Sequence, residues 1–132
     1  MTKKFDHAEC SGPKALRARE VLDLVADKWS LYVVARLHDG EQRFTELKRG
    51  IEGISQRMLT VTLRGLERDG LVTRTIYSAM PPNIAYRLTP TGATLVDATM
   101  PLITWAMDHL VSIDAARERY DHHAQEVREL IH

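Results

Sequence analysis

The sequence lacks several features that define common functional classes. Its 132 residues include one cysteine, which excludes a disulfide within the chain, and its formal net charge is zero. It has no run of about 18 apolar residues, so we expect no transmembrane helix. Glycine-rich phosphate loops, HExxH motifs and Cys/His zinc spacings are also missing. We therefore expect neither an enzyme nor a metal or cofactor site, and the polar N-terminus predicts a cytoplasmic protein.

The charges are unevenly distributed although they balance overall. Residues 43–87 carry eight basic and four acidic side chains, whereas residues 88–132 carry three basic and seven acidic ones. A polyanion such as DNA would therefore be bound by the middle of the chain. A balanced net charge suits a winged-helix protein-interaction module equally well, and this alternative stays open.

One stretch in the basic middle, residues 53–70, has the pattern of a capped amphipathic helix. Ser55 is suited to cap its start, and Gly70 is suited to follow its end. The inward face consists of Leu59, Leu63 and Leu66. The opposite face carries Gln56, Arg57, Thr60, Val61, Arg64 and Arg68. These side chains suit contacts with phosphates and base edges, although a solvated surface helix would explain the pattern as well.

The apolar periodicity predicts three helices before this stretch. They span residues 15–26, 28–38 and 44–50, with Asp27 as a cap of the second and a very short strand at 42–43. Their inward positions are Leu16, Val21, Leu22 and Val25, then Trp29, Tyr32, Val33 and Leu37, then Phe44, Leu47 and Ile51. The third helix is joined to the helix at 55–69 by a glycine turn, which is the helix-turn-helix pattern.

After Gly70 the pattern changes to that of a β-hairpin. Residues 71–77 and 84–88 are rich in strand-forming residues, and residues 78–83 are expected to form the turn. A hairpin directly after a helix-turn-helix predicts a winged helix over residues 15–89. The fold class is then mainly α with a small β-hairpin wing, an α+β arrangement, preceded by a flexible arm at residues 1–14.

From Thr89 onward the chain is expected to be helical, with a kink or restart at Pro101 and a final segment from Ala115. One apolar stripe consists of Leu95, Leu102, Ile103, Trp105, Ala106, Leu110 and Ile113. This stripe exceeds what a small helical core can cover. It would pack either onto its own domain or onto a second copy of the chain. We favour the second copy and predict a homodimer with residues 90–132 as its dimerisation region.

Several short motifs have a specific order and spacing. They are Asp27-Lys28-Trp29-Ser30, Asp39-Gly40, the run from Arg43 to Leu47, the run from Gly53 to Leu59, the run from Leu63 to Val72, Pro81-Pro82, Tyr86 and Leu88-Thr89. Together they resemble the HxlR family of bacterial winged-helix transcriptional regulators, which are related in fold to MarR-type proteins. The resemblance covers about residues 20–105. It implies a nucleoid-associated homodimer that binds double-stranded DNA at an inverted-repeat operator, as a repressor or an activator.

The resemblance also assigns site residues. The recognition helix falls on residues 55–69 and the wing on residues 77–84. The DNA-binding residues are Arg43, Thr45, Lys48, Ser55, Gln56, Arg57, Thr60, Val61, Arg64, Arg68, Arg74 and Asn83. Similar members often carry a basic residue where this chain has Asn83. Phosphate contacts are therefore expected mainly from the arginines.

Many members of the family carry a cysteine shortly before the first helix, and some use it to sense oxidants, electrophiles or quinones. Cys10 lies in this region, with Lys3, Lys4, His7 and Lys14 close in sequence. Nearby cations lower the pKa of a thiol. We expect control by thiol chemistry at Cys10 or by a small ligand, and an inert Cys10 is the alternative.

Overall fold

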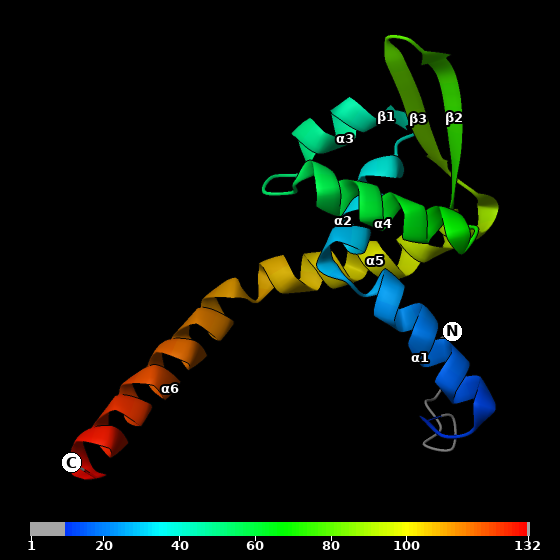
Figure 1. Cartoon of the computed structure of the whole chain (residues 1–132). Coiled ribbons are helices and arrows are strands. Elements are labelled where there is room, and N and C mark those ends of the chain that lie inside the picture. Colours follow the sequence, from blue (N-terminus) through cyan, green and yellow to red (C-terminus); the bar gives the residue numbers. More distant parts are fainter. Residues whose placement is uncertain (1–9, 132) are drawn as a thin grey trace. The chain divides into compact units, whose positions relative to one another are not determined.

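The computed structural model describes residues 10–131 and divides the chain into two compact units, one ending at Thr99 and the other beginning at Met100. The described residues form α1 (Pro13–Val25), α2 (Lys28–Leu37), β1 (Gln42–Arg43), α3 (Phe44–Gly50), α4 (Gln56–Arg68), β2 (Val72–Ala79), β3 (Pro82–Leu88), α5 (Pro90–Asp108) and α6 (Leu110–Ile131) (Figure 1). The mainly helical class with a small hairpin, predicted from the sequence, is confirmed.

The helix α4 forms where its caps and leucine spacing predict it. The Met58 N–H donates to the Ser55 hydroxyl oxygen at 3.0 Å, which satisfies one free amide of the first turn. The inward leucines Leu59, Leu63 and Leu66 are fully buried against the core of the first unit. The helix ends before Gly70, which adopts a φ of 74° that favours glycine.

The core of the first unit receives side chains from most of its helices and from its hairpin. It combines Val33, Val34 and Leu37 of α2 with Leu47 of α3, the leucines of α4, Val72 of β2, Tyr86 of β3 and Val96 of α5. A further residue, Thr62 of α4, is also buried. The helix α4 is thus held along its whole inward side, which leaves its other side exposed.

The three strands form one antiparallel sheet in the order β1-β3-β2. The hairpin of β2 and β3 extends beyond α2, α3 and α4 of the same unit (Figure 1). Its turn is shorter than predicted, because the ladder continues through the Ser78–Asn83 and Ala79–Pro82 pairs and leaves Met80 and Pro81 as the loop. Pro82 is tolerated there because it lies at the first position of its strand.

The start of α5 is tied to the segment that follows α4. The Thr89 hydroxyl donates to the Gly70 carbonyl at 2.6 Å and accepts the Gly92 N–H at 3.0 Å. The Thr89 N–H donates to the Leu71 carbonyl at 3.0 Å. Gly92 packs so closely on Leu71 that a Cβ atom there would overlap the Leu71 carbonyl oxygen. These contacts fix the position of the end of α4 relative to α5 within the first unit.

Three expectations for the N-terminal part of the chain were wrong. The first helix begins at Pro13, so the predicted arm extends too far, and residues 1–9 lie outside the described residues. Tyr32 is exposed rather than inward, and the α1 side chains Leu16, Val21 and Leu22 are also exposed in the single chain. Their periodicity marks an apolar face, which stays exposed within the first unit.

The C-terminal boundaries also differ from the expectation. Of the two alternatives for Pro101, a restart is wrong, because this proline lies inside α5. The last helix, α6, begins at Leu110 rather than near Ala115. The break occurs at His109, whose ring nitrogen Nδ1 lies 2.7 Å from the Trp105 carbonyl and whose ring stacks on Trp105 with centroids 4.6 Å apart. The side chain thus competes for a carbonyl at the helix end.

Candidate nucleic-acid interface

The exposed face of α4 is polar and basic along its length. Gln56, Arg57, Val61, Arg64 and Arg68 are exposed and Thr60 is half-buried, so the structure brings the predicted residues of this helix onto one surface. The segment from Ser55 to Leu66 contains no acidic residue. A surface of this kind can donate hydrogen bonds to phosphates and base edges.

The polar side chains of α4 are not equally free to bind. The Thr60 hydroxyl already donates to the Gln56 carbonyl at 2.9 Å. Thr60 therefore retains an acceptor and a methyl group for an external contact. Within the described residues, neither Arg64 nor Arg68 has an ion-pair partner, so their guanidinium groups are available to an anion.

The arginines outside α4 are in a different state. Arg74 of β2 pairs with Glu67 of α4 at 3.6 Å. Arg43 of β1 has its side-chain Nε atom 3.7 Å from Glu46, and its backbone N–H donates to the same carboxylate at 3.0 Å. A contact between either arginine and DNA would have to compete with its carboxylate. Thr45 and Lys48 are exposed on α3, as a backbone contact requires.

The wing tip lies inside the predicted turn, but Asn83, predicted to contact DNA, is not part of it. Met80, with 88% of its surface exposed, and Pro81 form the loop, whereas Asn83 is half-buried on β3. No charged residue occurs from Thr75 to Tyr86. The wing therefore offers no ionic contact to a phosphate, and Asn83 faces a cavity rather than the tip.

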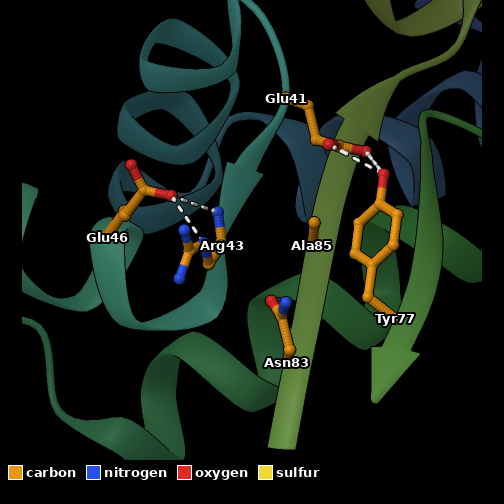
Figure 2. A pocket seen from close by; sticks show the side chains of 6 residues that line it. All are labelled: Glu41, Arg43, Glu46, Tyr77, Asn83 and Ala85. Carbon is orange, nitrogen blue, oxygen red and sulfur yellow. Dashed lines mark hydrogen bonds and ion pairs between the residues drawn. The ribbon is translucent and has the colours of Figure 1, made fainter.

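The cavity beside Asn83 lies between the hairpin and the segment from Glu41 to α3. It has a volume of about 310 Å³ and is lined by Glu41, Arg43, Glu46, Tyr77, Asn83 and Ala85. Figure 2 shows Tyr77 reaching from β2 past Ala85 toward Glu41, with Arg43 and Glu46 on the other side of β3. Sequence reasoning missed Glu41, Glu46 and Tyr77 as a group. Nothing in the local pattern links residues this far apart in the chain.

The Tyr77 hydroxyl donates to both carboxylate oxygens of Glu41, at 2.9 and 3.0 Å. This hydrogen bond is the main reason why the pKa of Tyr77 lies above its ordinary value. Tyr77 reaches Glu41 because the strand pairing shifts its register between Ile76 and Ser78. Such irregularities redirect a side chain, and here the redirected ring joins the hairpin to the segment before β1.

The HxlR-like helix-turn-helix family matches residues 24–114, which is more than half of the chain. The chain belongs to the HxlR family. YtfH of Escherichia coli K12, an uncharacterized HTH-type transcriptional regulator, is 36% identical over 101 residues, which cover 76% of this chain and 80% of YtfH. The resemblance predicted from the sequence motifs is confirmed.

Solved structures agree with this membership. YtfH from Salmonella typhimurium superposes with a TM-score of 0.73 at 38% identity, covering 76% of this chain and 90% of that one. The redox regulator HypR in its reduced form gives a TM-score of 0.67 at 34% identity, covering 75% of this chain and 98% of HypR. The fold is thus a winged helix-turn-helix, and the protein is a transcriptional regulator of this DNA-binding class rather than an enzyme.

Cys10, where the HxlR resemblance placed a sensor, is an exposed free thiol. It lies just before α1, whose N-terminus at Gly12 has no side-chain cap. Lys3, Lys4 and His7, which were expected to act on it, lie outside the described residues.

The residues predicted to form the dimer interface divide into two groups. Leu95 packs partly buried against the core of the first unit. In the second unit, Leu102, Trp105, Ala106 and Leu110 are exposed, while Ile103 and Ile113 are half-buried.

No helix among residues 10–131 is long and apolar enough to span a membrane. No group of metal-ligating side chains able to hold an ion occurs in the same range.

Proposed function

We propose that this HxlR protein binds double-stranded DNA as a homodimer at an inverted-repeat operator, with α4 in the major groove. The observation that carries the proposal is the exposed face of α4, which has three arginines and no acidic residue between Ser55 and Leu66. Its buried leucines hold this face rigidly against the core. Rigid presentation lowers the entropy lost on binding.

The two ends of α4 have different proposed roles. In helix-turn-helix complexes the N-terminal residues of the recognition helix contact base edges. Gln56, Arg57 and Thr60 are therefore the candidates for base contacts, with Thr60 acting through its methyl group or its free lone pairs. Arg64 and Arg68, without ion partners in the described chain, are the candidates for phosphate contacts. Ser55, Val61 and the α3 residues Thr45 and Lys48 would complete the surface.

The proposed homodimer rests on apolar surface that the single chain leaves exposed. In the first unit this surface comprises Leu16, Val21 and Leu22 of α1. In the second unit it comprises Leu102, Trp105 and Leu110 among others. A two-fold dimer would present its two copies of α4 to two half-sites that lie one helical turn, or about 34 Å, apart. We propose that residues 15–89 bind DNA and that residues 90–132 serve dimerisation, to which the exposed face of α1 would add contacts.

The test is a salt titration of duplex binding with wild-type protein and Arg57→Ala. Counterion release requires the affinity to fall steeply as salt rises, whereas a protein-interaction module has no such dependence on duplex. If Arg57 reads a guanine, Arg57→Ala costs about 1–3 kcal/mol on a selected duplex and much less on a random one. Affinity for duplex that is absent, or independent of salt, would refute the proposal.

A second element of the proposal concerns regulation by Cys10. Its support is the exposed thiol before α1 and the fold shared with HypR, which is a redox regulator. We propose that oxidation or adduct formation at Cys10 changes duplex affinity. Treatment with diamide should alter the affinity of the wild type and leave Cys10→Ser unchanged. Equal duplex affinities for the wild type and Cys10→Ser, each with and without diamide, would refute this element without affecting the DNA-binding proposal.

A further inference from the structure

The helix α6 is 22 residues long, and none of its residues is buried. Helices in proteins are stabilised mainly by the packing of an apolar face rather than by helix propensity. This helix carries apolar side chains along its whole length, and Leu110, Tyr120 and Ile131 are each more than half exposed. The HxlR match ends at residue 114, so most of α6 lies outside it. The second unit by itself leaves the apolar face of α6 without a partner.

The apolar side chains of α6 repeat with the spacing of a coiled coil. In such a repeat, with positions labelled a to g, the apolar positions a and d recur about every 3.5 residues. Here they fall, at alternating intervals of three and four residues, on Leu110, Ile113, Arg117, Tyr120, Ala124, Val127 and Ile131. All of them except Arg117 are apolar. The 22 residues span about three heptads, which is the length at which this pattern favours a coiled coil.

The exception in the repeat, Arg117, argues for an antiparallel pair of helices. In a parallel pair in register, each a residue faces the same residue of the other copy, so two Arg117 side chains would meet and repel each other. In an antiparallel pair, an a residue faces a d residue. The antiparallel register with the longest overlap places Arg117 opposite Val127 of the other copy. Its guanidinium can then reach solvent past a small apolar side chain.

The same antiparallel register matches side chains by size. It places Ile113 of one copy opposite Ile131 of the other, so the helices overlap over residues 113–131. It also places the large Tyr120 opposite the small Ala124. Large and small residues in facing positions fill a seam between helices without voids. Two-fold symmetry repeats each of these pairs, so both ends of the seam are equivalent.

The charges beside the seam fit this register as well. The flanking e positions bring Asp114 of one copy next to Arg128 of the other, and symmetry makes two such pairs. At the centre, Asp121 faces Asp121 of the other copy, which is one repulsive contact against two attractive ones. Exposed charges of this kind govern orientation and register more than affinity. The charge pattern therefore selects a second copy of α6 as the partner.

We propose that α6 pairs with α6 of a second copy of this chain as an antiparallel two-stranded coiled coil, with Ile113 opposite Ile131 and Tyr120 opposite Ala124. This inference rests on the proposed homodimer and deepens it, because it names the segment, the orientation and the register of the contact. The pair has a two-fold axis, as binding to an inverted repeat requires.

Cysteine cross-linking of the full chain in a Cys10→Ser background tests the register. The variant with both Ile113→Cys and Ile131→Cys should form a covalent dimer on mild oxidation, because the two positions face each other. Neither single variant should do so, since neither position faces itself. The matched control combines Ile113→Cys with Glu129→Cys, whose position is exposed on the outer side of the repeat.

Three results of this cross-linking would overturn the proposal. One is the absence of a covalent dimer in the variant with both Ile113→Cys and Ile131→Cys. Another is an equal yield from the control with Glu129→Cys, which would show that the thiols meet by random collision. The third is a covalent dimer of either single variant, which would show that the helices pair in parallel.

Sedimentation of the full chain tests the contribution of the seam to dimer affinity. Val127→Asp should weaken the dimer about 10–100-fold, because each copy loses an apolar contact. Gln125→Asp adds the same charge at an exposed position outside the seam and should change nothing. An unchanged dimer in Val127→Asp would overturn the coiled coil and leave the proposed homodimer to other surfaces. A wild type that stays monomeric throughout the concentration series would refute the homodimer itself.

Discussion

Arg64 offers the sharpest quantitative test of the interface. Its guanidinium is exposed on α4 and has no ion partner among residues 10–131, so it can neutralise a phosphate without breaking another contact. Each phosphate neutralised contributes about −0.9 to the slope of log K against log salt. A homodimer contains two copies of Arg64, so Arg64→Ala should make the slope less steep by about 1.8.

The assay is fluorescence anisotropy with a duplex that the protein itself selects from a random pool. Over a fourfold rise in salt, a slope difference of 1.8 means that the wild type loses about 12-fold more affinity than Arg64→Ala. Arg128→Ala, at an exposed position of α6, is the control for the change in net charge. Arg74→Ala should change the slope less than half as much, because Arg74 is held by Glu67.

Two results would contradict this reasoning. Equal slopes for the wild type and Arg64→Ala would show that Arg64 makes no phosphate contact. Equal changes in Arg64→Ala and Arg128→Ala would show that the effect arises from net charge rather than from α4. A change of half the expected size would indicate that one copy per complex contacts the duplex, which would contradict the symmetric dimer.

Three further predictions concern stability, each measured by denaturant unfolding. Gly92→Ala should lower the free energy of unfolding by about 1–3 kcal/mol, because the added Cβ would overlap the Leu71 carbonyl oxygen. Gly65→Ala should lower it less, because its Cβ meets only the end of a flexible side chain. Equal losses in the two variants would contradict the packing argument. Ser55→Ala should cost about 0.5–2 kcal/mol and Ser55→Asn almost nothing, since both Ser and Asn cap a helix. Burial raises the pKa of Tyr86 above its ordinary value of 10.0. The contribution of the protonated phenol to the free energy of unfolding is therefore complete below pH 10.0 and is lost as the pH rises through the higher pKa of the folded state. Tyr86→Phe should therefore flatten the alkaline loss of stability, and an unchanged alkaline profile would contradict this.

The sequence alone determined the local elements of the DNA-binding unit. The cap at Ser55, the leucine spacing of α4 and the glycine at its end act over a few residues, so their pattern specifies one helix with one buried face. The cap of α2 by Asp27 was predicted in the same way and is confirmed by its hydrogen bond from the Trp29 N–H. Because these interactions are short in range, they can be read without knowledge of the fold.

Only the tertiary structure decided which of the predicted side chains are free to act. It paired Arg74 with Glu67, joined Tyr77 to Glu41 across 36 positions and turned Asn83 toward a cavity. It also left Leu16 and its neighbours on α1 exposed, although their periodicity alone suggested burial. These outcomes depend on strand register and on contacts between distant elements. The sequence therefore defines the arginine face of α4. Long-range packing leaves Arg64 and Arg68 of this face without ion partners in the described chain, pairs Arg74 of β2 with Glu67, and creates the cavity beside the wing.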